Sequence, residues 1–256
     1  MAVPRRSRSA IALAAAVLVA AGAGLTVRRL FAARASRAAA ASAVPSGSSL
    51  APGSTDYVVL HVPHIPGGIN LDGDTDDQGW TMPPGPARTG GFLLANGATA
   101  RPYSETRLVW GDGYLYLSLY AADEDVETRT TKHDGPLWLD DSFRVTFWRP
   151  GTEYVIEVSP KAVITDSIRE DGGAYDYSWE SGAHASHELD GTMNKPDDED
   201  EEWVIELAVP FGSIGLKGEA GESIGFSVRR CDTPKQASRV CASFGEGATH
   251  ARLVLD

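Results

Sequence analysis

Short runs in which apolar and polar residues alternate dominate the chain from Tyr57 onward. In the run 114–120 (YLYLSLY), leucine occupies every second position, and tyrosine or serine fills the positions between. The run 203–209 (WVIELAV) places Trp, Ile, Leu and Val at alternate positions in the same way. Successive side chains of a strand point to opposite faces of its sheet. Both runs therefore predict strands with one face directed into a hydrophobic core.

Turn residues separate further runs of this kind. The sequence 111–113 (GDG) predicts a tight turn, and 149–152 (RPGT) predicts the turn of a hairpin. A single helical turn is predicted within 210–216, and no long stretch has a helical period. The other predicted strands are 106–110, 142–148, 153–158, 224–228 and 252–255. Short strands at regular spacing predict an all-β fold, a two-sheet antiparallel β-sandwich of the immunoglobulin-like kind.

The first 27 residues have a different character. Three arginines, Arg5, Arg6 and Arg8, precede an uncharged run, 9–27, that is rich in alanine. A positive segment followed by an apolar one is typical of an export signal, and A-x-A-like sequences at 21–23 and 41–43 would permit cleavage. The same run is also long enough to remain as one membrane-spanning helix. Residues 1–27 are therefore predicted to be a signal peptide or a membrane anchor, so we expect an exported protein of the cell envelope, either anchored or secreted.

The next segment, 28–56, is rich in Ala, Ser, Gly and Pro. This composition predicts a flexible linker that separates the domain 57–256 from the membrane.

Charge is distributed unevenly between these parts. Seven arginines and one acid precede Tyr57, whereas the residues from Tyr57 onward contain 16 Lys and Arg against 34 Asp and Glu. Such an acidic domain repels nucleic-acid phosphates and anionic membrane surfaces. We therefore expect no nucleic-acid partner, and membrane contact only through the N-terminal segment. Neutral ligands or divalent cations suit the domain better, and its six tryptophans and eight tyrosines supply rings that could stack on sugars.

Asp72, Asp74 and Asp76 alternate in the segment 71–77 (LDGDTDD). The pattern resembles the start of an EF-hand loop, but Asp77 replaces the expected glycine and Pro83 replaces the expected glutamate. A capped turn near a strand end is the alternative interpretation. If these residues bind a metal, their oxygen ligands predict calcium.

The two cysteines, Cys231 and Cys241, are expected in a loop between the last two strands. In an exported protein they would form a disulfide that closes this loop. In a cytoplasmic protein they would be two free thiols.

Candidate catalytic groups are few. Asp140 and Asp141 form an acidic pair, but adjacent residues at the start of a strand point to opposite faces, unlike the separated acid and base of a glycosidase. Backbone hydrogen bonding at the strand start is the alternative role for Asp141. No phosphate loop, nucleophile elbow or metal triad is found in the sequence, and the six histidines are interpreted as structural or exposed. We expect a protein that is not an enzyme, and at most an accessory domain for glycoside hydrolysis.

The domain resembles the family 9 carbohydrate-binding modules in an ordered set of motifs. The segment 69–80 (INLDGDTDDQGW) is similar to their opening I-D-G-x-x-D-x-x-W, with one extra residue before the tryptophan. The segments 107–116 (RLVWGDGYLY) and 123–126 (DEDV) resemble their V-x-V-L-W-D-x-x-Y-L-Y hairpin and the D-P-D-V that follows it. The segment 138–145 (WLDDSFRV) resembles W-x-x-D-S-V-E-I.

The resemblance continues to the end of the chain. The segments 203–210 (WVIELAVP) and 225–228 (GFSV) are similar to Y-x-x-E-x-A-I-P and G-F-N-I, and Phe244-Gly245 with 252–255 fits the closing F-G-x-L-x-L strand. The resemblance implies a β-sandwich related to the DOMON superfamily, in which two tryptophans clamp a terminal sugar and calcium is structural. No other cofactor is required.

The sugar site matches the family less well than the fold. Trp138 corresponds to one clamp residue, but the segment expected to supply the second, 239–243 (RVCAS), has no aromatic residue. Arg144 replaces the acid of S-V-E-I, and Glu157 lies in the strand that carries an arginine in sugar-binding members. The segment with Tyr175, Tyr177 and Trp179 could supply a replacement ring. The resemblance thus predicts a ligand site at Trp138, Asp140, Asp141, Glu157 and Trp179.

Three functions remain open from the sequence. The first is a non-catalytic module that binds a glycan at the cell envelope by aromatic stacking and polar contacts. The second is a structural or protein-interaction domain that has lost sugar binding. The third is a haem-binding electron-transfer domain, for which the candidate axial ligands are Met82, Met193, His133 and His187.

Overall fold

Two facing β-sheets form the domain. The computed structural model describes residues 58–235, 238–246 and 251–256, and the predicted signal or anchor (1–27) and linker (28–56) lie outside these residues. The elements are β1 (Val58–Val62), α2 (Gln78–Thr81), β2 (Ala87–Arg88), β3 (Ser104–Gly111), β4 (Tyr114–Ala122), η1 (Leu137–Leu139), β5 (Ser142–Arg149), β6 (Thr152–Val158), β7 (Ile164–Glu170), β8 (His184–Asp190), β9 (Glu202–Pro210), η2 (Phe211–Ile214), β10 (Ser223–Asp232), β11 (Val240–Phe244) and β12 (Ala251–Leu255). Within the described residues, none of the helices has the length and apolar character needed to cross a membrane.

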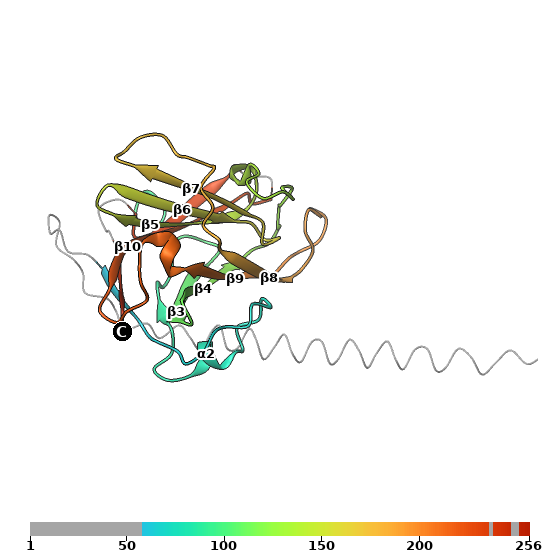
Figure 1. Cartoon of the computed structure of the whole chain (residues 1–256). Coiled ribbons are helices and arrows are strands. Elements are labelled where there is room, and N and C mark those ends of the chain that lie inside the picture. Colours follow the sequence, from blue (N-terminus) through green and yellow to red (C-terminus); the bar gives the residue numbers. More distant parts are fainter. Residues whose placement is uncertain (1–57, 236–237, 247–250) are drawn as a thin grey trace, which may run out of the picture. The chain divides into compact units, whose positions relative to one another are not determined.

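One layer is a seven-stranded sheet with the order β1-β12-β10-β5-β6-β7, in which β11 also pairs with β10. The other is a five-stranded sheet with the order β2-β3-β4-β9-β8. Figure 1 shows the two layers, with β10, β5, β6 and β7 above β3, β4, β9 and β8. Every pairing is antiparallel except that of β1 with β12. The predicted all-β sandwich is therefore confirmed, and each predicted strand and the helical turn at 210–216 corresponds to an observed element.

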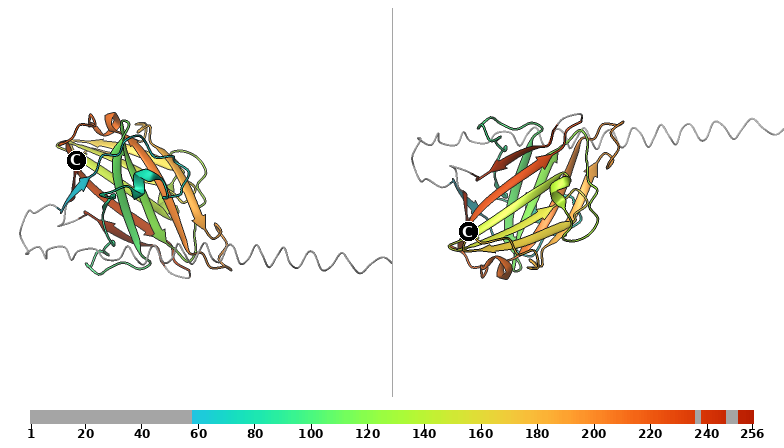
Figure 2. Two further views of the ribbon diagram at one scale, coloured as in Figure 1. Left: turned by 90° about the horizontal axis from the view of Figure 1, so that it is seen from below. Right: turned by 90° about the horizontal axis from the view of Figure 1, so that it is seen from above.

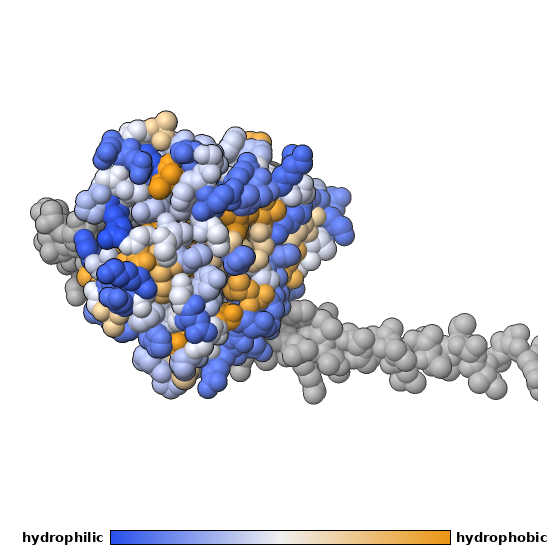
Figure 3. All heavy atoms as spheres, in the orientation of Figure 1, coloured by the Kyte–Doolittle hydropathy of each residue, from blue (hydrophilic) through white to orange (hydrophobic). Residues whose placement is uncertain are grey.

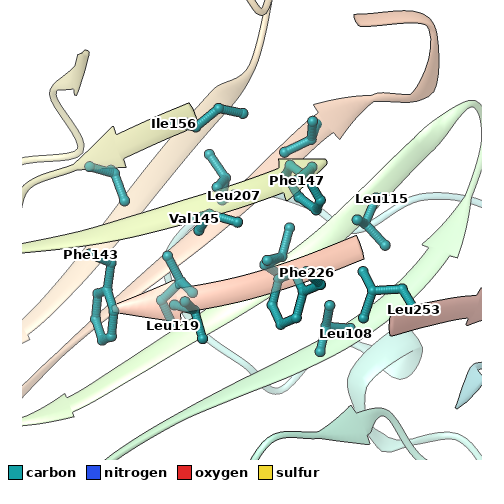
Figure 4. Packing of buried hydrophobic residues seen from close by; sticks show 14 of the residues in the cluster. Leu108, Leu115, Leu119, Phe143, Val145, Phe147, Ile156, Leu207, Phe226 and Leu253 are labelled. Carbon is teal, nitrogen blue, oxygen red and sulfur yellow. The ribbon is translucent and has the colours of Figure 1, made fainter. Parts of the chain in front are cut away.

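The core lies between the inner faces of the two sheets. The alternate leucines of β4, Leu115, Leu117 and Leu119, are fully buried, as their period of two predicts. They meet Phe143, Val145, Phe147 and Phe226 from the seven-stranded sheet in one cluster, part of which is shown in Figure 4. The inner face of β5 is thereby assigned to residues 143, 145 and 147, so residues 144, 146 and 148 point away from the core.

A second apolar cluster covers the outer face of the five-stranded sheet. Ile65, Ile69 and Trp80, from the chain that precedes β2, pack on Val109 and Tyr116. Figure 2 (left) shows α2 lying over this sheet.

A buried carboxylate holds this covering segment in place. Glu206, in the middle of β9, is fully buried and accepts hydrogen bonds from Trp80 Nε1 (2.7 Å) and from the backbone N–H groups of Asp72 (3.0 Å) and Gly73 (2.8 Å). Gly73 is required here, because a Cβ at this position would lie 2.3 Å from the backbone of His187. The chain before β2 thus covers the outer face of the five-stranded sheet around Val109 and Tyr116.

Candidate functional site

Strand register places a row of polar residues on the outer face of the seven-stranded sheet. Arg144 of β5 pairs with Glu157 of β6 on one side and with Arg229 of β10 on the other. Trp148 is similarly placed between Glu153 and Gly225. We call this surface the polar face, defined by Arg144, Thr146, Trp148, Glu153, Glu157, Ser227 and Arg229. Figure 2 (right) shows these strands from the outer side.

The charges of the polar face are balanced by neighbouring ion pairs. Arg144 Nη1 donates to Glu157 Oε1 over 2.9 Å, and Arg229 Nη2 lies 3.0 Å from Glu246 Oε1. Arg169 of β7 pairs with Glu153. The domain as a whole is strongly acidic, so a surface on which arginine and glutamate alternate is a local exception. It offers many fixed donors and acceptors without a large net field, which suits an uncharged polar ligand.

Two aromatic rings frame this surface. The hydroxyl of Tyr175 donates to Glu153 Oε1 (2.7 Å), and the guanidinium carbons of Arg144 and Arg169 lie 5.3 and 4.8 Å from the centre of its ring. These cation–π contacts orient the ring. Burial and the bond to Glu153 raise the pKa of Tyr175, so the hydroxyl remains a donor at neutral pH.

Trp148 rests directly on the sheet. A Cβ at position 225 would lie 2.1 Å from its Nε1, so the indole occupies the space that the missing side chain of Gly225 leaves. The absence of a side chain on β10 is therefore what allows the ring to lie against the strand.

Together these side chains line a shallow hollow of about 450 Å³. Its walls include Arg144, Trp148, Tyr175, Arg229 and Glu246. A second hollow, of about 760 Å³, shares Arg229, Gly245 and Glu246 with the first and extends past β11 to Leu93. Figure 3 shows that apolar residues on the visible surface form separate patches among hydrophilic ones.

Trp138 is placed on η1, immediately before β5. Its side chain is 60% exposed, and the neighbouring Leu139 is exposed as well. Trp138 lies outside the lining of the 450 Å³ hollow.

Asp140 and Asp141 are both buried. Asp140 Oδ2 accepts from the backbone N–H groups of Arg129 (3.0 Å) and Thr130 (2.8 Å). Asp141 accepts from the backbone N–H groups of Glu127 (2.6 Å) and Thr233 (2.8 Å). The geometry favours the backbone-bonding role, because both carboxylates tie loops to the start of β5 and are shielded from solvent.

The two remaining predicted ligand residues, Glu157 and Trp179, lie in different surroundings. Glu157 lies on the polar face in its pair with Arg144. Trp179 instead packs against Tyr154, with ring centroids 5.7 Å apart, and Tyr154 contacts the core. In the segment that contains Tyr175, Tyr177 and Trp179, it is Tyr175 that lines the 450 Å³ hollow.

Several residues of the polar face were missed by sequence reasoning. Trp148 was within reach, because residues 143, 145 and 147 are apolar and residues 144, 146 and 148 must then share the opposite face. Arg229 and Glu246 gave no such signal. The position of Arg229 depends on the pairing of β10 with β5, and Glu246 follows β11, which pairs with the other side of β10.

The calcium candidates lie in the turn that Glu206 anchors. Asp72 Oδ1 accepts from the backbone N–H of Asp74 (3.0 Å), and its Oδ2 accepts from Asn70 Nδ2 (2.7 Å). These bonds are those of a capped turn. Calcium binding by Asp72, Asp74 and Asp76 stays a prediction.

A buried acidic cluster lies at the other end of β10. Asp123, Asp141 and Asp232 each place a carboxylate oxygen within 4.8 Å of the others. Arg230 Nη2 lies 2.9 Å from Asp123 Oδ2 and 3.5 Å from Asp232 Oδ1, so a guanidinium supplies positive charge inside the cluster. Burial and the charge of Asp123 raise the pKa of Asp141 to about 8, and burial raises that of Asp232 to about 6. Arg230 offsets one of the three carboxylate charges, and the raised pKa of Asp141 removes a second at neutral pH.

The cysteines are joined by a disulfide, as predicted for an exported protein. Their expected place in a loop was wrong. Cys231 belongs to β10 and Cys241 to β11, and the two residues are direct partners in the pairing of these strands.

The haem candidates are spread over the domain. Met82 packs against the cluster on the outer face of the five-stranded sheet, whereas Met193 packs against the main core. The structure therefore does not bring these two sulfur atoms to one pocket.

Comparison with known proteins relates the fold to sugar-binding domains. No protein-family model and no curated protein sequence matches the chain. Among solved structures, a family 9 carbohydrate-binding module from Caldicellulosiruptor kristjanssonii in complex with cellotriose matches with a TM-score of 0.51 and 16% identity, over 77% of this chain and 93% of that one. The glucose complex of such a module from the same organism matches with a TM-score of 0.52 and 15% identity, over 78% and 96% of the two chains.

A further match is a protein from Bacteroides uniformis described provisionally as carbohydrate-binding. It has a TM-score of 0.58 and 12% identity, and the alignment covers 78% of this chain and all of that one. The domain therefore has the fold of the family 9 carbohydrate-binding modules, which confirms the fold expected from the ordered motifs.

Proposed function

We propose that the domain is a non-catalytic carbohydrate-binding module that holds an uncharged glycan on the polar face. The observation that carries the proposal is the hollow between Trp148 and Tyr175, floored by side chains of β5 and β10. A sugar offers an apolar ring face for stacking and hydroxyl groups for charged donors and acceptors, and the polar face presents both kinds of partner. Solved modules of this fold hold cellotriose and glucose, which supports the same ligand class.

The assignment of roles follows from position. Trp148 and Tyr175 provide the rings, and the pairs Arg144–Glu157 and Arg229–Glu246 provide the polar contacts. Trp138, exposed beside the start of β5, provides a third ring for a longer chain of sugars.

The same proposal places the domain outside the cytoplasm. Residues 1–27 would direct export and, if retained, hold the protein in the envelope, and 28–56 would act as the spacer. The disulfide between Cys231 and Cys241 supports an oxidising compartment.

Glycan binding is tested by affinity electrophoresis and calorimetry with cellotriose and other neutral oligosaccharides. We expect Tyr175→Ala, Trp148→Ala and Trp138→Ala each to weaken binding about tenfold or more, a loss of about 1.4 kcal/mol or more for one stacking ring. The matched control is Leu139→Ala, the exposed neighbour of Trp138, which should bind like the wild type.

Gly225→Ala tests the polar face without removing any of its side chains. The added methyl group would displace the Trp148 indole, so we expect weaker binding with little loss of fold. If the wild type binds no glycan on an array, sugar binding is rejected and the structural or protein-interaction domain becomes the better hypothesis.

Calcium is proposed as a structural ion of the turn at Asp72, Asp74 and Asp76. Its binding should raise the melting temperature of protein first treated with a chelator, by stabilising the folded state only. Asp74→Asn should abolish the rise, whereas Asp176→Asn, a change at a fully exposed aspartate elsewhere, should not. An equal rise in both variants would contradict this assignment.

A further inference from the structure

Three segments that are distant in sequence bring a histidine and two carboxylates together away from the polar face. His133 lies in the loop before η1, Asp166 in β7, and Glu180 in the segment before β8. One donor atom from each lies within 4.8 Å of the other two. His133 Nε2 is 3.0 Å from Glu180 Oε2 and 3.6 Å from Asp134 Oδ2.

Asp166 is the unusual member of this group. Its side chain is only 1% exposed, and its Oδ2 accepts from the backbone N–H of Ser181 (2.8 Å). Its Oδ1 is buried and has no hydrogen-bond partner among the described residues. A buried carboxylate oxygen without a partner is costly, and a bound cation is one of the few groups that would compensate for it.

We propose that His133, Asp166 and Glu180 form a binding site for a divalent transition-metal ion of the zinc type. One imidazole nitrogen and two carboxylate oxygens are a ligand set that zinc accepts, with a water molecule in the fourth position. Calcium prefers six to eight oxygen ligands, so the imidazole selects against it.

The geometry allows such an ion with small movements. Zinc ligands at about 2.0–2.2 Å in a tetrahedron lie roughly 3.3–3.5 Å from one another. Asp166 is fixed by Ser181, whereas the side chains of His133 and Glu180 are 50% and 63% exposed and free to adjust. The ion would join the loop at 133, strand β7 and the segment 171–183 that carries Tyr175, and so restrain that segment.

The test uses the full chain without a polyhistidine tag, stripped with a chelator and titrated calorimetrically with ZnCl₂. We expect the wild type to bind one zinc ion per chain. His133→Ala and Asp166→Asn should each abolish this binding or weaken it at least about tenfold. Glu180→Gln should weaken binding in the same direction. CaCl₂ should not compete with zinc at this site.

His61→Ala is the matched control, because His61 Nδ1 also pairs with one exposed carboxylate, Asp256 (2.8 Å), and belongs to none of the three-ligand groups of the described residues. It should bind zinc like the wild type. Circular dichroism of each variant checks the fold, and NMR of the histidine rings shows directly whether the His133 signal responds to zinc. The proposal is overturned if the wild type binds no zinc. It is also overturned if the His133 signal does not respond to zinc and both variants bind zinc as tightly as the wild type. Glycan binding has no part in these measurements.

Discussion

Asp141 is the residue whose charge state depends most on its surroundings in the fold. Its carboxyl is fully buried beside Asp123 and Asp232, and burial raises its pKa from 3.8 to about 8. Its folded pKa is above its unfolded value, so the native state binds a proton that the unfolded state has released. The contribution of Asp141 to the free energy of unfolding therefore falls as pH rises from about 4 to about 8, and levels off above that.

We expect the melting temperature to decrease between pH 6.5 and pH 8. One pH unit within the window is worth up to about 1.4 kcal/mol, or about 3–6 °C for a domain of this size. Differential scanning calorimetry at several pH values measures the slope. Asp141→Asn should flatten it, even if the variant is less stable at every pH through poorer bonding to the N–H groups of Glu127 and Thr233.

Asp176→Asn serves as the control for this change, since that carboxyl is fully exposed and its pKa is lowered by Ser178. Its slope should equal that of the wild type. The pKa of His133 is raised by its bond to Glu180, so His133 also makes the melting temperature fall with rising pH. This contribution is the same in the wild type and in the two variants. An unchanged slope in Asp141→Asn would show that Asp141 is ionised in the fold.

Among the elements, β11 depends most on a covalent link. It pairs only with β10 in the sheet, and the disulfide joins the two strands at Cys231 and Cys241. An isolated bridge on its other side connects Ser243 to Leu93. β11 also lines the 760 Å³ hollow next to the polar face, so its order affects both surfaces.

The double change Cys231→Ser and Cys241→Ser should lower stability by about 2–3 kcal/mol, the loop-closure entropy of about ten residues, or roughly 5–10 °C in melting temperature. Hydrogen exchange should become faster first at the amides of Leu93 and Ser243, which bond to each other's carbonyl groups. A reducing agent should reproduce the effect in the wild type and leave the double variant unchanged. Equal melting temperatures for the two proteins would mean that strand pairing alone holds β11.

The elements also show why some strands were predicted and others were missed. β4, β5 and β9 are inner strands buried on one side by the core, so their apolar residues recur at every second position. β8, with the sequence HASHELD, is an edge strand of partly buried and exposed residues and has no such period. β2 and β7 are also edge strands, and β11 pairs with β10 outside the main strand order. The apolar pattern of these three strands is correspondingly weak.

At the scale of the whole molecule, the two sheets differ in what covers their outer faces. The five-stranded sheet is partly covered by the chain that precedes β2, which the hydrogen bond between Trp80 and Glu206 holds in place. The seven-stranded sheet presents Arg–Glu pairs and two rings in a hollow. Solved structures with this fold share only 12–16% sequence identity with the chain.

The sequence by itself determined the frame of this protein. Alternation over a few residues reports which face of a strand is buried, and turn residues report where a strand ends, so both are readable locally. The tertiary structure decided the chemistry. It placed Arg144 between Glu157 and Arg229, buried Asp140 and Asp141 away from solvent, and turned Trp179 toward Tyr154 while Tyr175 entered the hollow. Each of these outcomes depends on which distant strands become neighbours, and local periodicity carries no information about that choice.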